Sequence, residues 1–471
     1  MKLNDKPKHK IKMNLGAVIV CCILCLGGGF LIGNQKNKAS ITTSQGTNKV
    51  QEVYDILKNK WLNTGDAIDL DETLAKAMME AVGDPYNSYF TQSELTNFQD
   101  SINKNYEGIG VAFNTNAGLP IITKVYEGSP AKKAGLQEGD ILQAVDHQSI
   151  QDKSSDEIVE MVRGESGSDV ILTILRKQKT FDVTITRAKV DYSALYEIKT
   201  ANDHQYGLIT LSSFGTTTAS EVQKALDYFT QENIDTLVFD VRGNPGGYLQ
   251  AAKGILDLLL EKGQVELITE NKQGKQVEYV SSNEQPYRFS HGYVLINNSS
   301  ASASEVLTGA LKEVLGYTVI GEQSYGKGVA QDQATLSDLS VVKYTYAKWL
   351  LPSGKWIGGE GITPDIEVKN ISLEGLYNFE LDSSLQQDSV DERIAQFQKM
   401  LKLIGYDCGR EDGYFSENTK TVLQQFEKDH QLTENGTFDQ EDKNALISAV
   451  IEYAYASQND EQYKKLESLI Q

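Results

Sequence analysis

Between residues 192 and 375 the chain alternates short apolar runs with segments of helical spacing, and this alternation constrains the fold more than any other feature. The apolar runs cover residues 207–214, 236–241, 293–298 and 318–323. Continuous runs rich in β-branched residues suit strands that are buried on both faces of a sheet. The helical spacing between them fits residues 218–231, 249–260 and 304–315. We therefore predict an α/β core of catalytic type over residues 189–375.

A serine-rich turn, NNSSASASEV at residues 297–306, follows one predicted strand and precedes a predicted helix. The unpaired N–H groups at a helix N-terminus stabilise developing negative charge, and small alanines leave room for a substrate carbonyl. Serine is also a common helix N-cap, so this stretch by itself supports a nucleophile and a structural cap equally. Of the five histidines in the chain, His291 is the nearest in sequence and lies before the strand. A Ser/His/Asp arrangement is therefore poorly supported.

A lysine between two glycines offers a different base. The segment GEQSYGKGVAQ, residues 321–331, begins at a strand end and places Lys327 between glycines. Desolvation lowers the pKa of a lysine amine, so that a lysine removed from water can be neutral and accept a proton. Serine and lysine form a known nucleophile–base pair, and the amide of Gln331 is suited to orient the amine. A Ser/His hydrolase that uses His291 is the enzymatic alternative.

The turn DVRGNPGGYL, residues 240–249, follows another predicted buried strand. Gly246 and Gly247 allow the backbone to approach a ligand closely. Their N–H groups, together with that of Ala303, are candidates to bind the oxyanion of a tetrahedral intermediate. Taken alone, an ordinary Gly/Pro turn is the simpler interpretation of this segment.

Residues 106–188 alternate short strands with Gly-rich turns. The apolar strand GIGVAF precedes the turn EGSPAKKAGLQEGD, and a helix is predicted at residues 155–162. This order and the SPAxxAGLxxGD pattern resemble PDZ domains, which bind a peptide as an added strand and hold its terminal carboxylate with backbone N–H groups. The resemblance places those groups at Gly108, Ile109 and Gly110. A small β domain that only packs against its neighbours is the alternative.

The N-terminal residues predict a membrane anchor. Residues 1–14 carry five lysines against one aspartate, and residues 15–32 contain no charge. An apolar run of this length just suffices to span a bilayer, and the lysines favour a cytoplasmic N-terminus. We predict a cytoplasmic tail and transmembrane helix at residues 1–34, a tether at 35–47 and a helical segment at 48–105. A cleaved signal peptide is the alternative.

Beyond the core, residues 376–388 lose their periodicity and become acidic and polar, which predicts a linker. Residues 389–450 have the spacing of a compact helical unit, and residues 451–471 predict a charged helical tail. The helical unit resembles a peptidoglycan-binding domain in its LxxxGY, DGYFxxxT, VxxFxxxxxL and GTFD segments. That resemblance implies peptidoglycan as a partner, and a generic three-helix bundle is the alternative.

Several of these motifs, in their order along the chain, resemble the carboxyl-terminal processing peptidases, also called tail-specific proteases. The resemblance extends over roughly residues 48–370 and rests on the DVRGNPGG, SASASE, GEQSYGKGVAQ and LPSGKWIGGEGITPDIEV segments. It implies a site composed of the nucleophile Ser302, the base Lys327, the orienting residue Gln331, and the oxyanion donors Gly247 and Ala303. The segment YAKWLLPSG departs mildly from the family pattern, which affects the substrate groove and no catalytic group.

The resemblance also implies an endopeptidase that cuts proteins near apolar, unstructured C-termini. The PDZ domain would read the tail, and Arg163 is a candidate to couple this domain to the protease body. A solvated surface arginine is the alternative at this position. The rival to an enzyme is a catalytically silent scaffold that binds protein tails and the cell wall.

The formal net charge of −20 argues against nucleic acid as a partner, because phosphate binding needs a basic face. No zinc-type spacing of Cys or His is present, so we expect no metal and no cofactor. We predict a multidomain α/β protein: a transmembrane helix, a helical N-terminal segment, a PDZ β-domain inserted before an α/β serine protease core, and a small α-helical C-terminal domain. The predicted location is the cell membrane, single-pass, with the catalytic domain on the cell-wall side. Homo-oligomer formation is left open.

Overall fold

The computed structural model describes residues 49–62, 69–103, 106–115, 120–126, 128–151, 153–176, 179–190, 193–371, 373 and 379–471. The predicted cytoplasmic tail, transmembrane helix and tether lie outside the described residues. Within the described ranges, no helix combines the length and the apolar character that crossing a membrane requires. The chain divides into two compact units, Met1–Ser88 and Tyr89–Gln471.

The first unit contains two helices, α2 (Lys49–Lys60) and α3 (Leu70–Ala81). Asp69 caps α3, because its carboxylate accepts hydrogen bonds from the backbone N–H groups of Asp71 and Glu72. Neither helix buries a residue fully. The second unit begins with α4 (Gln92–Asn103), which also lies in the segment predicted to be helical.

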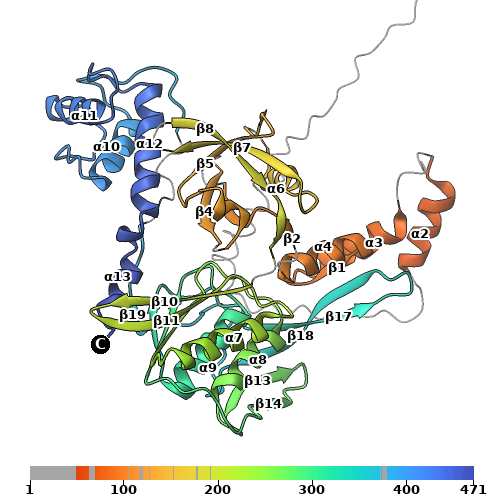
Figure 1. The fold of residues 1–471 in the computed structure, drawn as a ribbon. Helices are drawn as coiled ribbons and strands as arrows, with labels where there is room; N and C mark the ends of the chain where they lie inside the picture. The colour runs from red at the N-terminus through yellow and green to blue at the C-terminus, as the bar shows by residue number, and fades with distance from the viewer. Residues whose placement is uncertain are drawn as a thin grey trace, which may run out of the picture. The chain divides into compact units, whose positions relative to one another are not determined.

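The second unit is built around a six-stranded sheet (Figure 1). In spatial order its strands are β10 (Ala194–Ala201), β11 (His204–Leu211), β12 (Thr236–Asp240), β15 (His291–Ile296), β16 (Thr318–Gly321) and β19 (Ile366–Glu367). The strands from β11 to β19 run parallel, and β10 is antiparallel to β11. Every residue of β12 is buried. The prediction of an α/β core whose strands are covered on both faces is confirmed.

Different parts of the chain cover the two faces of this sheet. One face packs against α7 (Thr218–Gln231), α8 (Leu249–Leu259) and α9 (Ala303–Leu315). Leu237 and Phe239 point to that side, because alternate residues of a strand face opposite ways. Val238 points to the other side, where it clusters with Leu466 and Ile470 from the C-terminal end of the chain.

An antiparallel sheet extends from the core. Its strands include β13 (Val265–Asn271), β14 (Gln276–Val280), β17 (Val329–Thr335) and β18 (Val341–Leu350). Strand β18 pairs with both β13 and β17, and β13 pairs with β14. Strand β17 begins two residues after Lys327, so this sheet holds the loop that carries the candidate base.

The PDZ domain precedes the core. Its sheet has the order β3-β4-β5-β7-β8, with β6 paired to β5. The elements are β3 (Val111–Asn114), β4 (Ile121–Val125), α5 (Pro130–Lys133), β5 (Ile141–Val145), β6 (Gln148–Ser149), α6 (Ser155–Val162), β7 (Asp169–Arg176) and β8 (Lys179–Thr186). Strands β2 (Tyr106–Gly108) and β9 (Ala188–Val190) pair where the chain enters and leaves the domain. Helix α6 begins where predicted, because Ser154 and Glu157 form a capping box.

The C-terminal helical domain contains α10 (Glu392–Leu403), α11 (Glu417–Asp429) and α12 (Gln440–Tyr455), followed by η2 (Ser457–Asn459) and α13 (Glu461–Glu467). Phe379 and Leu385, from the predicted polar linker, belong to the core of this domain. Isolated apolar residues in a polar segment have no periodicity that would indicate their burial. The same cluster contains Ile451 of α12 together with Ile121 and Ile141 of the PDZ sheet.

Candidate active site

Ser302 lies where the turn after β15 enters α9. It occupies the N-cap position of the helix with φ +56° and ψ −114°. A positive φ at a residue other than glycine is strained and persists only where the surroundings fix it. Ser302 is partly exposed, whereas Ala301 and Ala303 beside it are buried. The structure thus presents a hydroxyl at a helix N-terminus, where backbone N–H groups favour negative charge.

Lys327 lies on the loop between β16 and β17. Its Nζ donates a hydrogen bond of 2.8 Å to Oε1 of Gln331. The indole N–H groups of Trp349 and Trp356 donate to the carbonyl oxygens of Lys327 and Gly328, each at 2.7 Å. The loop that carries the amine is therefore fixed along its backbone as well as through its side chain.

Glu305, on the first turn of α9, connects the serine turn to the lysine loop. Its Oε2 accepts hydrogen bonds from the backbone N–H groups of Ser302 at 2.8 Å and Lys327 at 2.9 Å. Its Oε1 accepts from the Ser324 hydroxyl and from the Gly326 N–H, both at 2.6 Å. Burial raises the pKa of the Glu305 carboxyl, and these four donors oppose that effect.

The turn between β12 and α8 lies directly against the serine turn. The Ala301 N–H and the Ser304 hydroxyl both donate to the carbonyl oxygen of Asn244, at 3.0 and 2.9 Å. A Cβ placed on Gly246 would lie 2.8 Å from the Ala301 carbonyl oxygen and 2.9 Å from the Ser302 Cβ. Only glycine permits this close approach of the two backbones.

Ala303 follows Ser302 directly, and Gly247 follows Gly246, on which a Cβ would lie 3.0 Å from the Ala303 backbone nitrogen. Within the part of the chain that the structure describes, neither the Gly247 amide nor the Ala303 amide donates a hydrogen bond. Gly247 has φ +151°, and a Cβ at this position would collide with the backbone of Phe214. The backbone of Gly247 is therefore held in place by Phe214, which pairs with it as an isolated bridge. Two uncommitted N–H groups close to a strained serine have the composition of an oxyanion hole.

His291 is separated from the serine. It is the first residue of β15, whereas Ser302 follows the carboxyl end of that strand. A strand rises by about 3.3 Å per residue, so the two ends of β15 are roughly 16 Å apart. The structure therefore argues against the alternative in which His291 activates Ser302.

The PDZ domain contains a groove of about 290 Å³. Gly108, Ile109 and Gly110 line it together with side chains from α6. Arg163, the C-cap residue of α6, lies at the edge of the same groove and is exposed. The predicted tail-binding residues and the predicted coupling residue are thus brought together.

Three residues of the site, Glu305, Trp349 and Trp356, were not predicted from the sequence. The spacing Ser-x-x-Glu at residues 302–305 is the pattern of a capping box, and it signals a carboxylate that returns to the N-cap N–H. This signal predicts the bond to Ser302 but gives no indication of the bond to Lys327. The contacts of the two tryptophans have no local signal, because their partners are more than twenty residues away in sequence.

Models of known families match three parts of the chain. Residues 205–368 match peptidase family S41, residues 121–176 match a PDZ domain and residues 390–446 match a peptidoglycan-binding domain. These matches confirm the PDZ domain, the serine protease core and the C-terminal domain that the sequence predicted.

Known relatives match over most of the chain. It is 34% identical to the carboxy-terminal processing protease CtpB of Bacillus subtilis over 396 residues, which are 83% of this chain and 82% of the relative. It is 29% identical over 449 residues to a CtpA-like serine protease of Staphylococcus epidermidis, covering 95% and 90%. The solved photosystem II D1 C-terminal processing protease matches with a TM-score of 0.45 at 25% identity, covering 67% of this chain and 88% of that one. The chain belongs to peptidase family S41 and, within it, to the carboxy-terminal processing serine proteases with a PDZ domain.

Proposed function

We propose that the protein is a membrane-anchored, extracytoplasmic endopeptidase that recognises apolar protein C-termini and cleaves by a Ser/Lys mechanism. The observation that carries this proposal is the hydrogen bond of 2.8 Å from Lys327 Nζ to Gln331 Oε1. This hydrogen bond orients the Lys327 amine. The loop that carries Lys327 is joined to the backbone of Ser302 through hydrogen bonds to Glu305. An oriented base on a fixed loop near a serine is what nucleophilic catalysis requires.

In the proposed reaction, the Ser302 hydroxyl attacks the substrate carbonyl while its proton passes to the neutral amine of Lys327. The N–H groups of Gly247 and Ala303 hold the oxyanion of the tetrahedral intermediate. The Lys327 ammonium then gives its proton to the leaving amine, and the peptide bond breaks to leave an acyl-enzyme. Water hydrolyses the acyl-enzyme in the same way, with Lys327 again accepting the proton. Gln331 accepts one amine hydrogen throughout and so directs the lone pair.

The other domains would bring substrate and enzyme to one place. The apolar lining of the PDZ groove, which includes Ile109, Phe113 and Val159, supports recognition of an apolar tail. Arg163 at the groove edge is the proposed link between tail binding and the protease body. The C-terminal domain would bind peptidoglycan, and residues 15–32 would anchor the chain in the membrane. These roles suit an enzyme on the cell-wall side of the membrane.

The test is cleavage of an unfolded protein with an apolar C-terminus by the full-length protein in mild detergent. Ser302→Ala and Lys327→Ala are expected to lose activity by at least about 10³-fold, because each removes a group that reacts. Gln331→Ala is expected to retain part of the activity, since it removes only the orientation of the base. The parental rate should rise with pH as the lysine amine loses its proton.

His291→Ala is the matched control and should cleave at the parental rate. Activity that persists in Lys327→Ala would contradict the lysine base. A parent that binds tails and peptidoglycan but does not cleave, even with PDZ-binding peptides added, would favour the scaffold instead.

A further inference from the structure

The C-terminal segment that contains α13 lies outside the three parts of the chain that match known families. Its sequence is charged, yet Leu466 and Ile470 are buried on the face of the central sheet that the core helices leave open. They cluster there with Leu208, Val238 and Ile320 from three parallel strands. Helix α13 therefore packs against the central sheet, and Figure 1 shows it next to β10 and β19.

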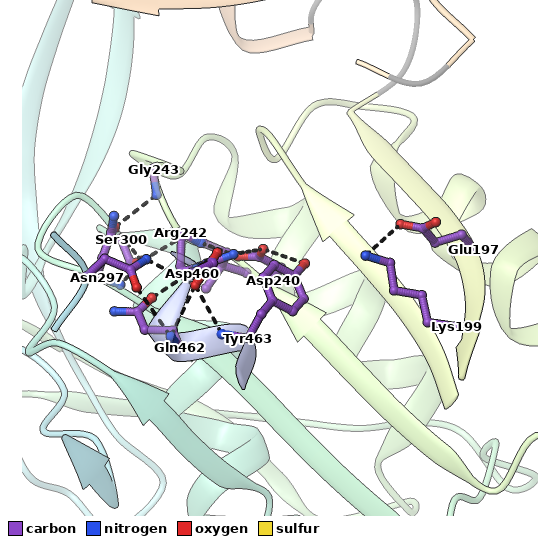
Figure 2. Close-up of polar contacts among 12 residues, drawn as sticks. Glu197, Lys199, Asp240, Arg242, Gly243, Asn297, Ser300, Asp460, Gln462 and Tyr463 are labelled. Atoms are coloured by element: carbon purple, nitrogen blue, oxygen red, sulfur yellow. Dashed lines mark hydrogen bonds and ion pairs between the residues drawn. The ribbon is translucent and has the colours of Figure 1, made fainter. Parts of the chain in front are cut away.

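Helix α13 also reaches the base of the turn that carries Gly247. Figure 2 shows Arg242, the second residue after β12, between acidic groups from both sides. Its guanidinium donates to both oxygens of Asp240 at 2.9 and 2.8 Å. It also donates to both oxygens of Asp460 at 3.1 and 2.9 Å and to Oε1 of Gln462 at 3.1 Å. Arg242 is thus held from two directions by charge-assisted hydrogen bonds.

Tyr463 completes this cluster from the same helix. Its hydroxyl donates a hydrogen bond of 3.0 Å to Oδ2 of Asp240, and its ring lies 4.6 Å from the Arg242 guanidinium carbon. The Lys199 amine lies 4.9 Å from the centre of the same ring. Burial alone would raise the pKa of Asp240, but the charge and hydrogen bonds of Arg242 lower it to about 2. Asp240 is therefore ionised at neutral pH.

From Arg242, hydrogen bonds continue to the serine turn. The Gly243 N–H donates to Oδ1 of Asn297 at 2.9 Å, and the Ser300 hydroxyl donates to the Val241 carbonyl oxygen at 2.8 Å. Figure 2 shows Asn297 and Ser300 beside Gly243 at one end of the cluster and Tyr463 at the other. The start of the turn is thus fixed by the serine turn on one side and by α13 on the other.

We propose that Asp460 and Tyr463 are positioning residues for the reaction: through Arg242 and Asp240 they hold the turn that presents the Gly247 N–H to the oxyanion. This inference rests on the proposed function of Gly247. Neither residue would touch the substrate. Their loss would let the turn drift relative to Ser302, and a misplacement of about 1 Å in an active site can reduce the rate by about a hundredfold.

Tyr463→Phe and Asp460→Asn in the full-length protein test this role. Tyr463→Phe removes the hydroxyl that donates to Asp240, and Asp460→Asn removes the negative charge beside Arg242. Both substitutions keep the shape of the side chain. We expect kcat to fall by roughly tenfold or more while KM stays within about twofold, because the oxyanion forms only in the transition state. Asp460→Glu keeps the charge beside Arg242 and should recover part of kcat. Lys464→Ala, at an exposed position of the same helix, is the matched control and should leave kcat unchanged.

Hydrogen exchange of the amides of residues 241–248 provides a readout that does not depend on cleavage. Exchange should be faster in Tyr463→Phe and Asp460→Asn than in the parent and in Lys464→Ala, at an unchanged melting temperature. Parental exchange and parental kcat in both variants would overturn the positioning role. Failure of the proposed function would look different: Ser302→Ala would equal the parent in cleavage, while the exchange experiment would still decide whether α13 holds the turn.

Discussion

The Glu305 carboxylate accepts the backbone N–H of Lys327 at 2.9 Å, although the two residues are 22 positions apart in sequence. The same oxygen accepts the backbone N–H of Ser302 at 2.8 Å. One buried acid therefore fixes the candidate base relative to the candidate nucleophile. In this arrangement the Glu305 carboxylate joins the loop of Lys327 to the turn of Ser302.

We predict that Glu305→Gln lowers kcat by at least about tenfold and stability by about 1–3 kcal/mol. All four partners of Glu305 are donors, and the amide NH₂ of glutamine would face two of them without accepting. Cleavage kinetics and thermal melting measure the two effects. Glu313→Gln is the matched control, because Glu313 lies on the same helix and, among the residues that the structure describes, bonds only to the exposed Ser353. Parental kcat in Glu305→Gln would show that the carboxylate is dispensable.

Gly247→Ala should reduce kcat by about a hundredfold or more, the usual cost of losing an oxyanion donor. The new Cβ would collide with the backbone of Phe214 and push the Gly247 N–H out of position. Gly263→Ala controls for backbone strain, since Gly263 also has a positive φ, of +88°, but open space around it. If both variants kept the parental kcat at a normal melting temperature, the Gly247 amide would have no role in the reaction.

The stability of the core should decrease as the pH rises from about 4.5 to about 7, because of the buried carboxyl group of Glu266. This side chain on β13 is 2% exposed, and its Oε2 has no hydrogen-bond partner in the part of the chain that the structure describes. Burial raises the pKa of Glu266 from its ordinary value of 4.5 to about 7. A raised pKa means that the folded state favours the protonated form. The contribution of protonated Glu266 to the free energy of unfolding is complete below about pH 4.5 and is lost as the pH rises through about 7.

Glu266→Gln should therefore be more stable than the parent at pH 8, by about 1–3 kcal/mol, and similar to it at pH 5. Denaturant unfolding at the two pH values measures the difference. Glu278→Gln, on the exposed side of the neighbouring strand β14, should follow the parent at both. An equal free-energy difference at pH 5 and pH 8 would contradict the buried titration.

Val159→Asp should weaken tail binding by the PDZ domain by at least about tenfold. Val159 lines the groove, and a carboxylate there would repel the terminal carboxylate of a peptide and lose apolar contact. Fluorescence anisotropy with a labelled peptide that ends in apolar residues measures the affinity. Glu160→Gln changes a neighbouring exposed position outside the groove and should bind as the parent does. Equal affinity of the parent, Val159→Asp and Glu160→Gln for the peptide would show that the peptide binds outside this groove.

The sequence by itself determined the local elements and the order of the domains. Helix α7 begins and ends where its apolar spacing predicted, because apolar residues at helical spacing form the face that packs against the core. The continuous apolar run at residues 236–241 likewise predicted that β12 is buried on both faces of the sheet. The motif order indicated Ser302, Lys327 and Gln331 as candidate site residues, and the structure contains a hydrogen bond between the side chains of Lys327 and Gln331.

Only the tertiary structure decided what covers the second face of the sheet and what holds the site together. The apolar pattern of the strand indicates that Val238 is buried but not which residues cover it. Those residues lie on the C-terminal segment, more than two hundred positions away in sequence. The same holds for Arg242 and Asp460, whose opposite charges are 218 positions apart. The physical reason is that burial of one face requires apolar residues at regular spacing along the sequence. A hydrogen bond between distant residues requires no such spacing, so the sequence gives no local sign of it.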